Sequence, residues 1–132
     1  MKIKTNELIG QALDWAVSYA LGHNPMKGFH SHGMTWRGWW ETATYIDTKP
    51  NEYRRVPRYS TDWSQGGPII EREKIATAYE PSMIYDDSCR WKALHPMSDN
   101  YHYYGPTPLI AAMRCLVALK LGDEVEIPEE LK

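Results

Sequence analysis

The chain is poor in cysteine and almost without phenylalanine, because its 132 residues include two Cys and one Phe. Cys89 and Cys115 do not have the spacing of a disulfide framework, and they suit a reducing cytosol. A chain of this length holds one hydrophobic core and leaves little room for a second. We therefore predict a single domain over residues 1–132 of a cytoplasmic protein.

An excess of basic charge is also missing. The chain has 15 Lys and Arg against 17 Asp and Glu, which gives a formal net charge of −2. It therefore lacks the positive field that attracts a nucleic-acid backbone, and we expect no nucleic-acid duplex as a partner. No apolar run approaches the length of a membrane span, and the amino terminus has no signal-peptide core. We therefore expect no membrane partner.

Motifs of catalysis are absent from the sequence as well. It contains no glycine loop followed by lysine that could cradle phosphates, and no nucleophile elbow. His30 and His32, with His23 nearby, have no carboxylate or thiol at ligand spacing. Cys89 and His95 lack the further ligands that zinc needs. We predict no catalytic residue, no metal and no cofactor.

Tryptophan and tyrosine are abundant instead, with six Trp and nine Tyr. Aromatic side chains with a polar edge suit surfaces that are half buried and half wet, such as pockets and interfaces. A purely structural core would contain more Phe and Leu. The aromatic composition therefore favours a binding protein.

Three helices are predicted from apolar periodicity and end signals. The first has apolar residues at helical spacing between Leu8 and Ala20, with Thr5 as its N-cap and Gly22 at its C-terminus. The third is dense in apolar residues from Leu109 to Leu121, with Thr107 as a cap and Pro108 in its first turn. Gly122 ends it, and we expect the acidic tail 123–132 to fray.

The central stretch, residues 59–71, combines cap residues with a double glycine and a proline. Ser60 or Thr61 can cap a helix there, and Asp62 places negative charge where the helix dipole favours it. Asp62 could itself cap the helix, or accept from a ribose hydroxyl or a base N–H. Gly66-Gly67-Pro68 is expected to weaken or restart that helix. Such a sequence can keep the backbone bare for a ligand to approach, although a packing constraint would require the same residues.

Strands are predicted at residues 1–4, 34–40, 74–79 and 90–94, the last two as an antiparallel pair. With the three helices, this order predicts an α/β (α+β) fold. We expect a small single-domain sandwich in which three helices pack on a short, mostly antiparallel sheet.

Both ends and the middle of the chain resemble a known family. The residues that carry the resemblance are 1–8, 12–17, 60–71, 104–115 and 120–125. They look like the NinX-type proteins of lambdoid phages. The Tyr-Ser-Thr-Asp motif at 59–62, followed by a helix, is more distantly similar to small phage proteins described as an alpha-beta-alpha sandwich domain.

This resemblance leaves residues 22–58 and 81–103 as variable loops. It implies a phage or prophage accessory protein made in the host bacterial cytosol. It brings no activity, because the family is one of unknown function.

A ligand site is predicted where two helices begin, at Thr61-Asp62 and at Thr107-Pro108. Helix starts bind anions when they converge on one cleft, although each threonine could simply cap its own helix. Trp and Tyr rings near them could stack on a planar base. Arg114 interrupts an apolar helix, where it either extends to solvent or meets a buried acid such as Asp14 or Glu71; we expect the ion pair first and a bound anion second. The predicted ligand-binding residues are Ser60, Thr61, Asp62, Trp63, Gln65, Gly66, Gly67, Trp39, Trp40, Tyr104, Gly105, Thr107 and Arg114.

These features favour a protein that binds a small nucleotide-like or anionic aromatic ligand without turnover, such as a nucleotide signal of host antiviral defence. That hypothesis requires a pocket shared by residues 60–67 and 104–108. One alternative is a protein-protein interaction module that uses aromatic loops at 36–40 and 101–104. A second is a nucleotide hydrolase with Asp62 or Glu71 as base. A homo-oligomer whose pocket is completed by a neighbouring copy is also expected.

Overall fold

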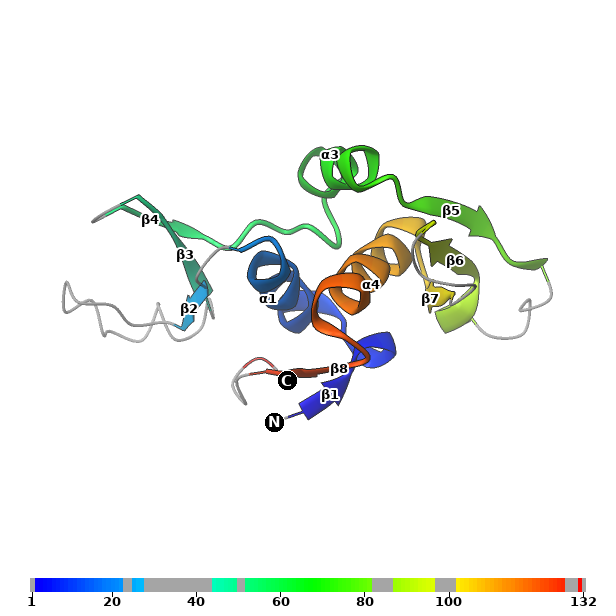
Figure 1. Cartoon of the computed structure of the whole chain (residues 1–132), viewed down its shortest axis with the longest axis horizontal. Helices are drawn as coiled ribbons and strands as arrows, with labels where there is room; N and C mark the ends of the chain where they lie inside the picture. Colours follow the sequence, from blue (N-terminus) through cyan, green and yellow to red (C-terminus); the bar gives the residue numbers. More distant parts are fainter. Residues whose placement is uncertain are drawn as a thin grey trace.

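The computed structural model describes residues 2–22, 25–27, 44–49, 52–81, 87–96, 102–127 and 131. Within them the chain is a mixed α and β structure with antiparallel strands, as predicted (Figure 1). Its elements are β1 (Lys2–Lys4), η1 (Thr5–Glu7), α1 (Gly10–Ala20), β2 (Pro25–Lys27), β3 (Thr44–Lys49), β4 (Glu52–Arg55), α3 (Trp63–Glu73), β5 (Ala76–Tyr79), η3 (Asp87–Cys89), β6 (Trp91–Leu94), β7 (Tyr103–Gly105), α4 (Pro108–Leu121) and β8 (Glu124–Glu126).

Helix α4 lies at the centre of the described structure. It contacts α1, α3 and the strands β5, β6 and β7 (Figure 1). Its predicted ends are confirmed: the Thr107 side chain accepts a hydrogen bond from the Ile110 N–H at 3.1 Å, Pro108 begins the helix, and Gly122 follows it with φ +96°. Residues 109–117 are all buried, so the apolar faces of several elements meet on this helix.

Helix α1 begins later than predicted. Thr5 lies in the short helix η1, and Ile9 is the N-cap of α1 without a side-chain hydrogen bond. The Thr5 hydroxyl instead donates to the Gly122 carbonyl at 2.7 Å, across 117 positions of sequence. Thr5 as a cap of α1 was therefore wrong, because a tertiary hydrogen bond takes its side chain. Gly22 follows the helix with φ +88°, as predicted.

Helix α3 is continuous through its double glycine and proline. Asp62 is its N-cap, and its carboxylate accepts from the Ser64 N–H at 2.9 Å. The predicted restart at Gly66-Gly67-Pro68 was wrong, since all three residues lie inside the helix, and a weakening of the helix there stays a prediction. Lys74 ends it in a left-handed conformation with φ 58°, so β5 begins at Ala76.

The strands form three small sheets rather than the single sheet predicted. Their orders are β1-β8, β2-β3-β4 and β5-β6-β7, all antiparallel. The predicted pairing of the strands near 74–79 and 90–94 is confirmed, with Thr77 opposite Ala93. The stretch 22–58 contains β2-β3-β4, so it is not only loop. The predicted strand at 34–40 lies outside the described residues.

The acidic tail begins with ordered structure instead of fraying. Val125 of β8 pairs with Ile3 of β1, and Val125 and Ile127 are both buried. The alternating Glu-Val-Glu sequence suits a strand that is buried on one face. The tail prediction therefore failed at residues 124–127, because this strand needs a partner from the opposite end of the chain.

No helix among the described residues is long and apolar enough to cross a membrane.

Candidate functional site

Ser60, a predicted ligand residue, serves the fold. Its backbone N–H and its hydroxyl both donate to Oδ1 of Asp14 in α1, at 2.8 and 2.6 Å. Ser60 is 1% exposed. Burial raises the pKa of the Asp14 carboxyl, and the hydrogen bonds from Ser60 and the charge of Arg58 oppose that rise. The pair therefore anchors the entry to α3 on α1.

The residues that open α3 lie at the surface. Thr61, Trp63 and Gln65 are exposed, and Trp63 is one of the exposed large aromatic side chains. Asp62 caps the helix, and its pKa is lowered by hydrogen bonds from the Ser64 side chain and backbone. Capping by Ser60 or Thr61 was therefore wrong, whereas capping by Asp62 is confirmed. The start of α3 is thus an ordinary capped helix end.

The glycines of the predicted site have packing roles. A Cβ on Gly66 would overlap the Tyr59 carbonyl oxygen and lie 2.6 Å from Leu109 Cδ1. A Cβ on Gly105 would lie 2.8 Å from the Ala111 backbone nitrogen. Gly67 is different, because its nearest contact would be Trp63 Cε3 at 3.8 Å. Close approach of α4 therefore explains Gly66 and Gly105 without a ligand.

Three cavities formed by described residues, of about 380, 460 and 200 Å³, are each lined by other residues than the two helix starts together. The Thr107 side chain is engaged in capping α4. The pocket predicted between residues 60–67 and 104–108 therefore has no support in this part of the chain. Trp39 and Trp40 lie outside the described residues, so their role stays a prediction. His23, His30 and His32 also lie outside them, and what was predicted for these histidines stays a prediction too.

Arg114 occupies an unusual place on α4. Its side chain is buried, with the residue 6% exposed, and it donates from Nε to the Leu8 carbonyl at 2.8 Å and from Nη1 to the Tyr104 carbonyl at 2.6 Å. No carboxylate of the described residues forms a salt bridge with it. The predicted ion pair with Asp14 or Glu71 was therefore wrong: Asp14 binds Ser60, and Glu71 is exposed.

Burial lowers the pKa of the Arg114 guanidinium, and the nearby Cys89 opposes that change. An arginine remains protonated despite such a shift. These two hydrogen bonds use Nε and Nη1, so the Nη2 donors have no hydrogen-bond partner among the described residues. The desolvated Arg114 guanidinium is thus held by two backbone carbonyls and retains N–H donors that no described residue accepts from.

A cavity of about 460 Å³ opens beside this guanidinium. We call it the Arg114 cleft. The Asn6 side chain accepts from the Tyr104 N–H at 3.4 Å, which ties η1 to β7 at its edge. Tyr104 and Arg114 are the predicted site residues that the structure brings together there. Its lining residues are Asn6, Glu7, Ser88, Cys89, Tyr104 and Arg114.

Asn6, Glu7, Ser88 and Cys89 were not predicted to bind a ligand. They come from η1 and η3, two short helices far apart in sequence. No local motif joins them, and only an unpaired arginine in an apolar helix indicated this region. Among the described residues, no three His, Cys, Asp or Glu side chains gather as a metal site.

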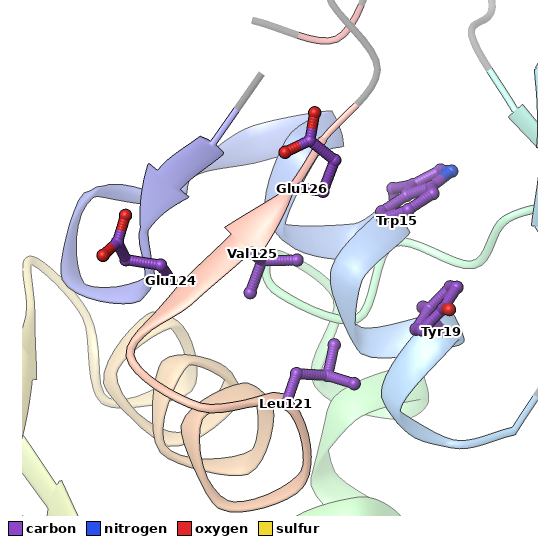
Figure 2. A pocket seen from close by; sticks show the side chains of 6 residues that line it. All are labelled: Trp15, Tyr19, Leu121, Glu124, Val125 and Glu126. Carbon is purple, nitrogen blue, oxygen red and sulfur yellow. The ribbon is translucent and has the colours of Figure 1, made fainter.

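A second cavity, of about 380 Å³, lies between α1 and β8 (Figure 2). We call it the β8 groove. Trp15 and Tyr19 of α1 stack with their ring centroids 5.4 Å apart and their planes at 22°. Tyr19 is 52% exposed, whereas Trp15 is 8% exposed. The groove is lined by Trp15, Tyr19, Leu121, Glu124, Val125 and Glu126.

Comparison with known proteins identifies one family. A family model described as "Bacteriophage P22, NinX" matches residues 4–120. The matched range includes η1, α1, α3 and almost all of α4, and thus every residue that lines the Arg114 cleft. None of the curated proteins matches the chain.

Proposed function

The chain belongs to the NinX family of phage proteins, and we propose that it binds a small anionic, nucleotide-like ligand in the Arg114 cleft without turning it over. The observation that carries the proposal is the buried Arg114 guanidinium, which has no carboxylate partner among the described residues. Burying a cation is costly unless an opposite charge or further hydrogen bonds compensate it. A bound anion would supply both.

The geometry of Arg114 suits an oxyanion. Guanidinium donors match carboxylate and phosphate oxygens in a fixed fork, and charge-assisted hydrogen bonds are the stronger class. The Leu8 and Tyr104 carbonyls fix the orientation of the fork before a ligand arrives. Less conformational entropy is then lost on binding.

The rest of the cleft fits a ligand with a planar part. Tyr104 lines it, and aromatic stacking contributes about 1–3 kcal/mol per base in nucleic-acid complexes. Asn6 and Ser88 bring polar side chains that could select among ligands. Its volume of about 460 Å³ is in the range of small-molecule pockets.

Binding without turnover agrees with the side chains at hand. Glu7 brings a carboxylate to the cleft, whose lining residues include no histidine, and the described residues contain no cluster that could hold a metal. General acid-base chemistry needs a partner within hydrogen-bond reach of the reacting group. As a phage accessory protein in the bacterial cytosol, the chain would in this way sequester a nucleotide signal of host antiviral defence.

The test is a thermal-shift screen of the purified protein with AMP, cyclic mononucleotides, cyclic dinucleotides and inorganic phosphate. We expect a nucleotide to raise the unfolding midpoint more than phosphate does, and to be recovered intact after denaturation. Recovery of an altered nucleotide would favour the hydrolase alternative. The absence of any shift would overturn the proposal.

Two variants locate the site. Tyr104→Ala removes the ring from the cleft but keeps the backbone carbonyl that holds Arg114. Trp63→Ala removes an exposed aromatic side chain from the start of α3, away from the cleft, and serves as the control. We expect only Tyr104→Ala to reduce the nucleotide shift. Loss of the shift in Trp63→Ala alone would move the site to α3, as the sequence first indicated.

A further inference from the structure

Strand β5 lies at an edge of its sheet, because the strand order is β5-β6-β7 (Figure 1). Natural proteins usually protect such an edge with a charged side chain, a proline, a bulge or a covering segment. β5 has none of the first three, since its sequence is Ala-Thr-Ala-Tyr and its pairing with β6 is regular. All four of its residues are exposed. The outer edge of β5 is therefore open to another strand.

The register of the β5-β6 ladder shows which backbone groups face this edge. The Glu80 N–H donates to the Arg90 carbonyl at 2.8 Å, so these two residues are a hydrogen-bonded pair. Hydrogen-bonded and non-hydrogen-bonded pairs alternate along an antiparallel ladder, so Ala78 is of the first type, and Thr77 and Tyr79 are of the second. The N–H and C=O groups of Thr77 and Tyr79 consequently point away from β6. No described residue forms a hydrogen bond with them.

The outward-facing positions on either side of these two residues can pair only in part. On the N-terminal side, the Ile75 N–H donates to the Ile70 carbonyl at 3.1 Å, so the end of α3 already uses this donor. On the C-terminal side, Pro81 has no N–H. The open edge of β5 thus consists of two donors and two acceptors, which belong to Thr77 and Tyr79.

A second copy of the same strand matches this edge. In an antiparallel ladder with a two-fold axis at Ala78, Thr77 of each copy lies opposite Tyr79 of the other. Both donors and both acceptors of each copy are then used. A shift to either side brings Ile75 or Pro81 into the ladder and leaves a carbonyl without a donor. The edge is therefore self-complementary in one register.

The side chains of β5 suit the same register. A β-branched side chain opposite an aromatic one, as Thr77 would lie opposite Tyr79, is a favourable cross-strand pair. Tyr79 contacts the Trp91 ring edge-on and is still 44% exposed, so it has surface left to bury. At the axis, Ala78 would meet Ala78 as a non-hydrogen-bonded pair, the more closely spaced type, where small side chains fit. The ladder brings no like charges together within β5.

We propose that two copies of this chain pair through β5 in a two-fold symmetric antiparallel ladder, with Thr77 of one copy opposite Tyr79 of the other. The two β5-β6-β7 sheets then become one continuous sheet across the dimer. No residue of β5 lines the Arg114 cleft, so this pairing does not depend on ligand binding.

The test is sedimentation equilibrium of the full chain from micromolar to millimolar concentration, a range that suits a small interface. We expect a reversible monomer-dimer equilibrium. Thr77→Pro removes a donor from the outer edge alone, because proline is tolerated in an edge strand where its nitrogen faces outward. It should raise the dissociation constant of the dimer at least tenfold, with an unchanged circular dichroism spectrum as the check of folding. A wild-type monomer at every concentration, or a Thr77→Pro dimer as tight as wild type, would overturn the proposal.

Charges at Ala78 test the register, because this residue meets its own copy at the axis. Ala78→Lys and Ala78→Glu should each prevent dimer formation, since like charges would lie directly opposite each other. An equal mixture of the two variants should form a heterodimer. Ala76→Lys is the matched control, because Ala76 is an exposed alanine on the same face of β5, and it should still dimerise. An Ala78→Lys homodimer as tight as wild type, or a mixture that stays monomeric, would contradict the proposed ladder.

Discussion

The carboxylate of Asp14 accepts two hydrogen bonds from one residue, the N–H and the hydroxyl of Ser60, 46 positions later in the chain. Both groups are buried, so water does not replace the contact if it is lost. The pair joins α1 to the segment that enters α3. It therefore has a larger role in stability than in recognition.

Replacing Asp14 tests this role. Asp14→Ala leaves the Ser60 N–H without its acceptor and should lower the free energy of unfolding by about 1–3 kcal/mol. Asp14→Asn retains an oxygen that can accept both hydrogen bonds and should cost less. Urea denaturation of both variants measures the difference. Equal losses would show that the hydrogen bonds contribute little.

The same pair predicts a pH dependence. The pKa of Asp14 in the folded chain is raised above its usual 3.8, so the folded state holds the proton more tightly than the unfolded state does. The stability that this group contributes is therefore complete below a pH of about 3.8 and is lost as the pH rises through the raised pKa. The stability of Asp14→Asn relative to wild type should accordingly increase from pH 4 to pH 7. A constant difference would contradict the shift.

Gly66 and Gly67 should respond oppositely to alanine. Gly66→Ala forces a methyl group against the Tyr59 carbonyl and Leu109, and should destabilise the chain by about 1–3 kcal/mol. Gly67→Ala meets only an ordinary van der Waals contact with Trp63 in the same helix and should stabilise it by up to about 1 kcal/mol. Thermal unfolding of the two variants provides the comparison. A stable Gly66→Ala variant would contradict the close packing of α3 on α4.

The two threonines at the helix starts should also differ. Thr107→Ala removes the cap of α4 and should cost about 0.5–2 kcal/mol. Thr61→Ala changes an exposed residue that does not cap α3, and should change stability by less than about 0.5 kcal/mol. Chemical denaturation distinguishes them. A large effect at Thr61 would indicate a contact beyond the described residues.

What could be predicted from the sequence was mainly local. The cap, proline and glycine that bound α4 act within one helical turn, so Thr107, Pro108 and Gly122 were assigned correctly. Strand pairing near residues 77 and 93 followed from the turn residues that separate two candidate strands adjacent in sequence. The partners of Ser60, Thr5 and Arg114 are 46, 117 and 106 positions away, and no local pattern specifies them. Arg114 was recognised as exceptional, but its carbonyl partners were not foreseen.

The cysteines offer a chemical test of the cleft. Cys115 is buried on α4, and burial raises the pKa of its thiol to about 11, so it should resist alkylation at pH 8. Cys89 lines the cleft beside Arg114 and should react. The ratio of the alkylation rate by anionic iodoacetate to that by neutral iodoacetamide should be higher at Cys89 than for free cysteine. The reason is that Arg114 attracts the carboxylate of iodoacetate. Mass spectrometry measures both rates. A ratio equal to that of free cysteine would argue against a positive cleft.

The most direct test of ligand binding follows the Nε–H signal of Arg114 by NMR during a titration with AMP. The hydrogen bond to the Leu8 carbonyl should make this signal observable, and Arg72, whose Nε donates to Glu73 at the surface, is the internal control. We expect a saturable shift of the Arg114 signal while that of Arg72 stays constant. If both signals move together with ionic strength, or neither moves at saturating nucleotide, the Arg114 cleft is not a nucleotide site.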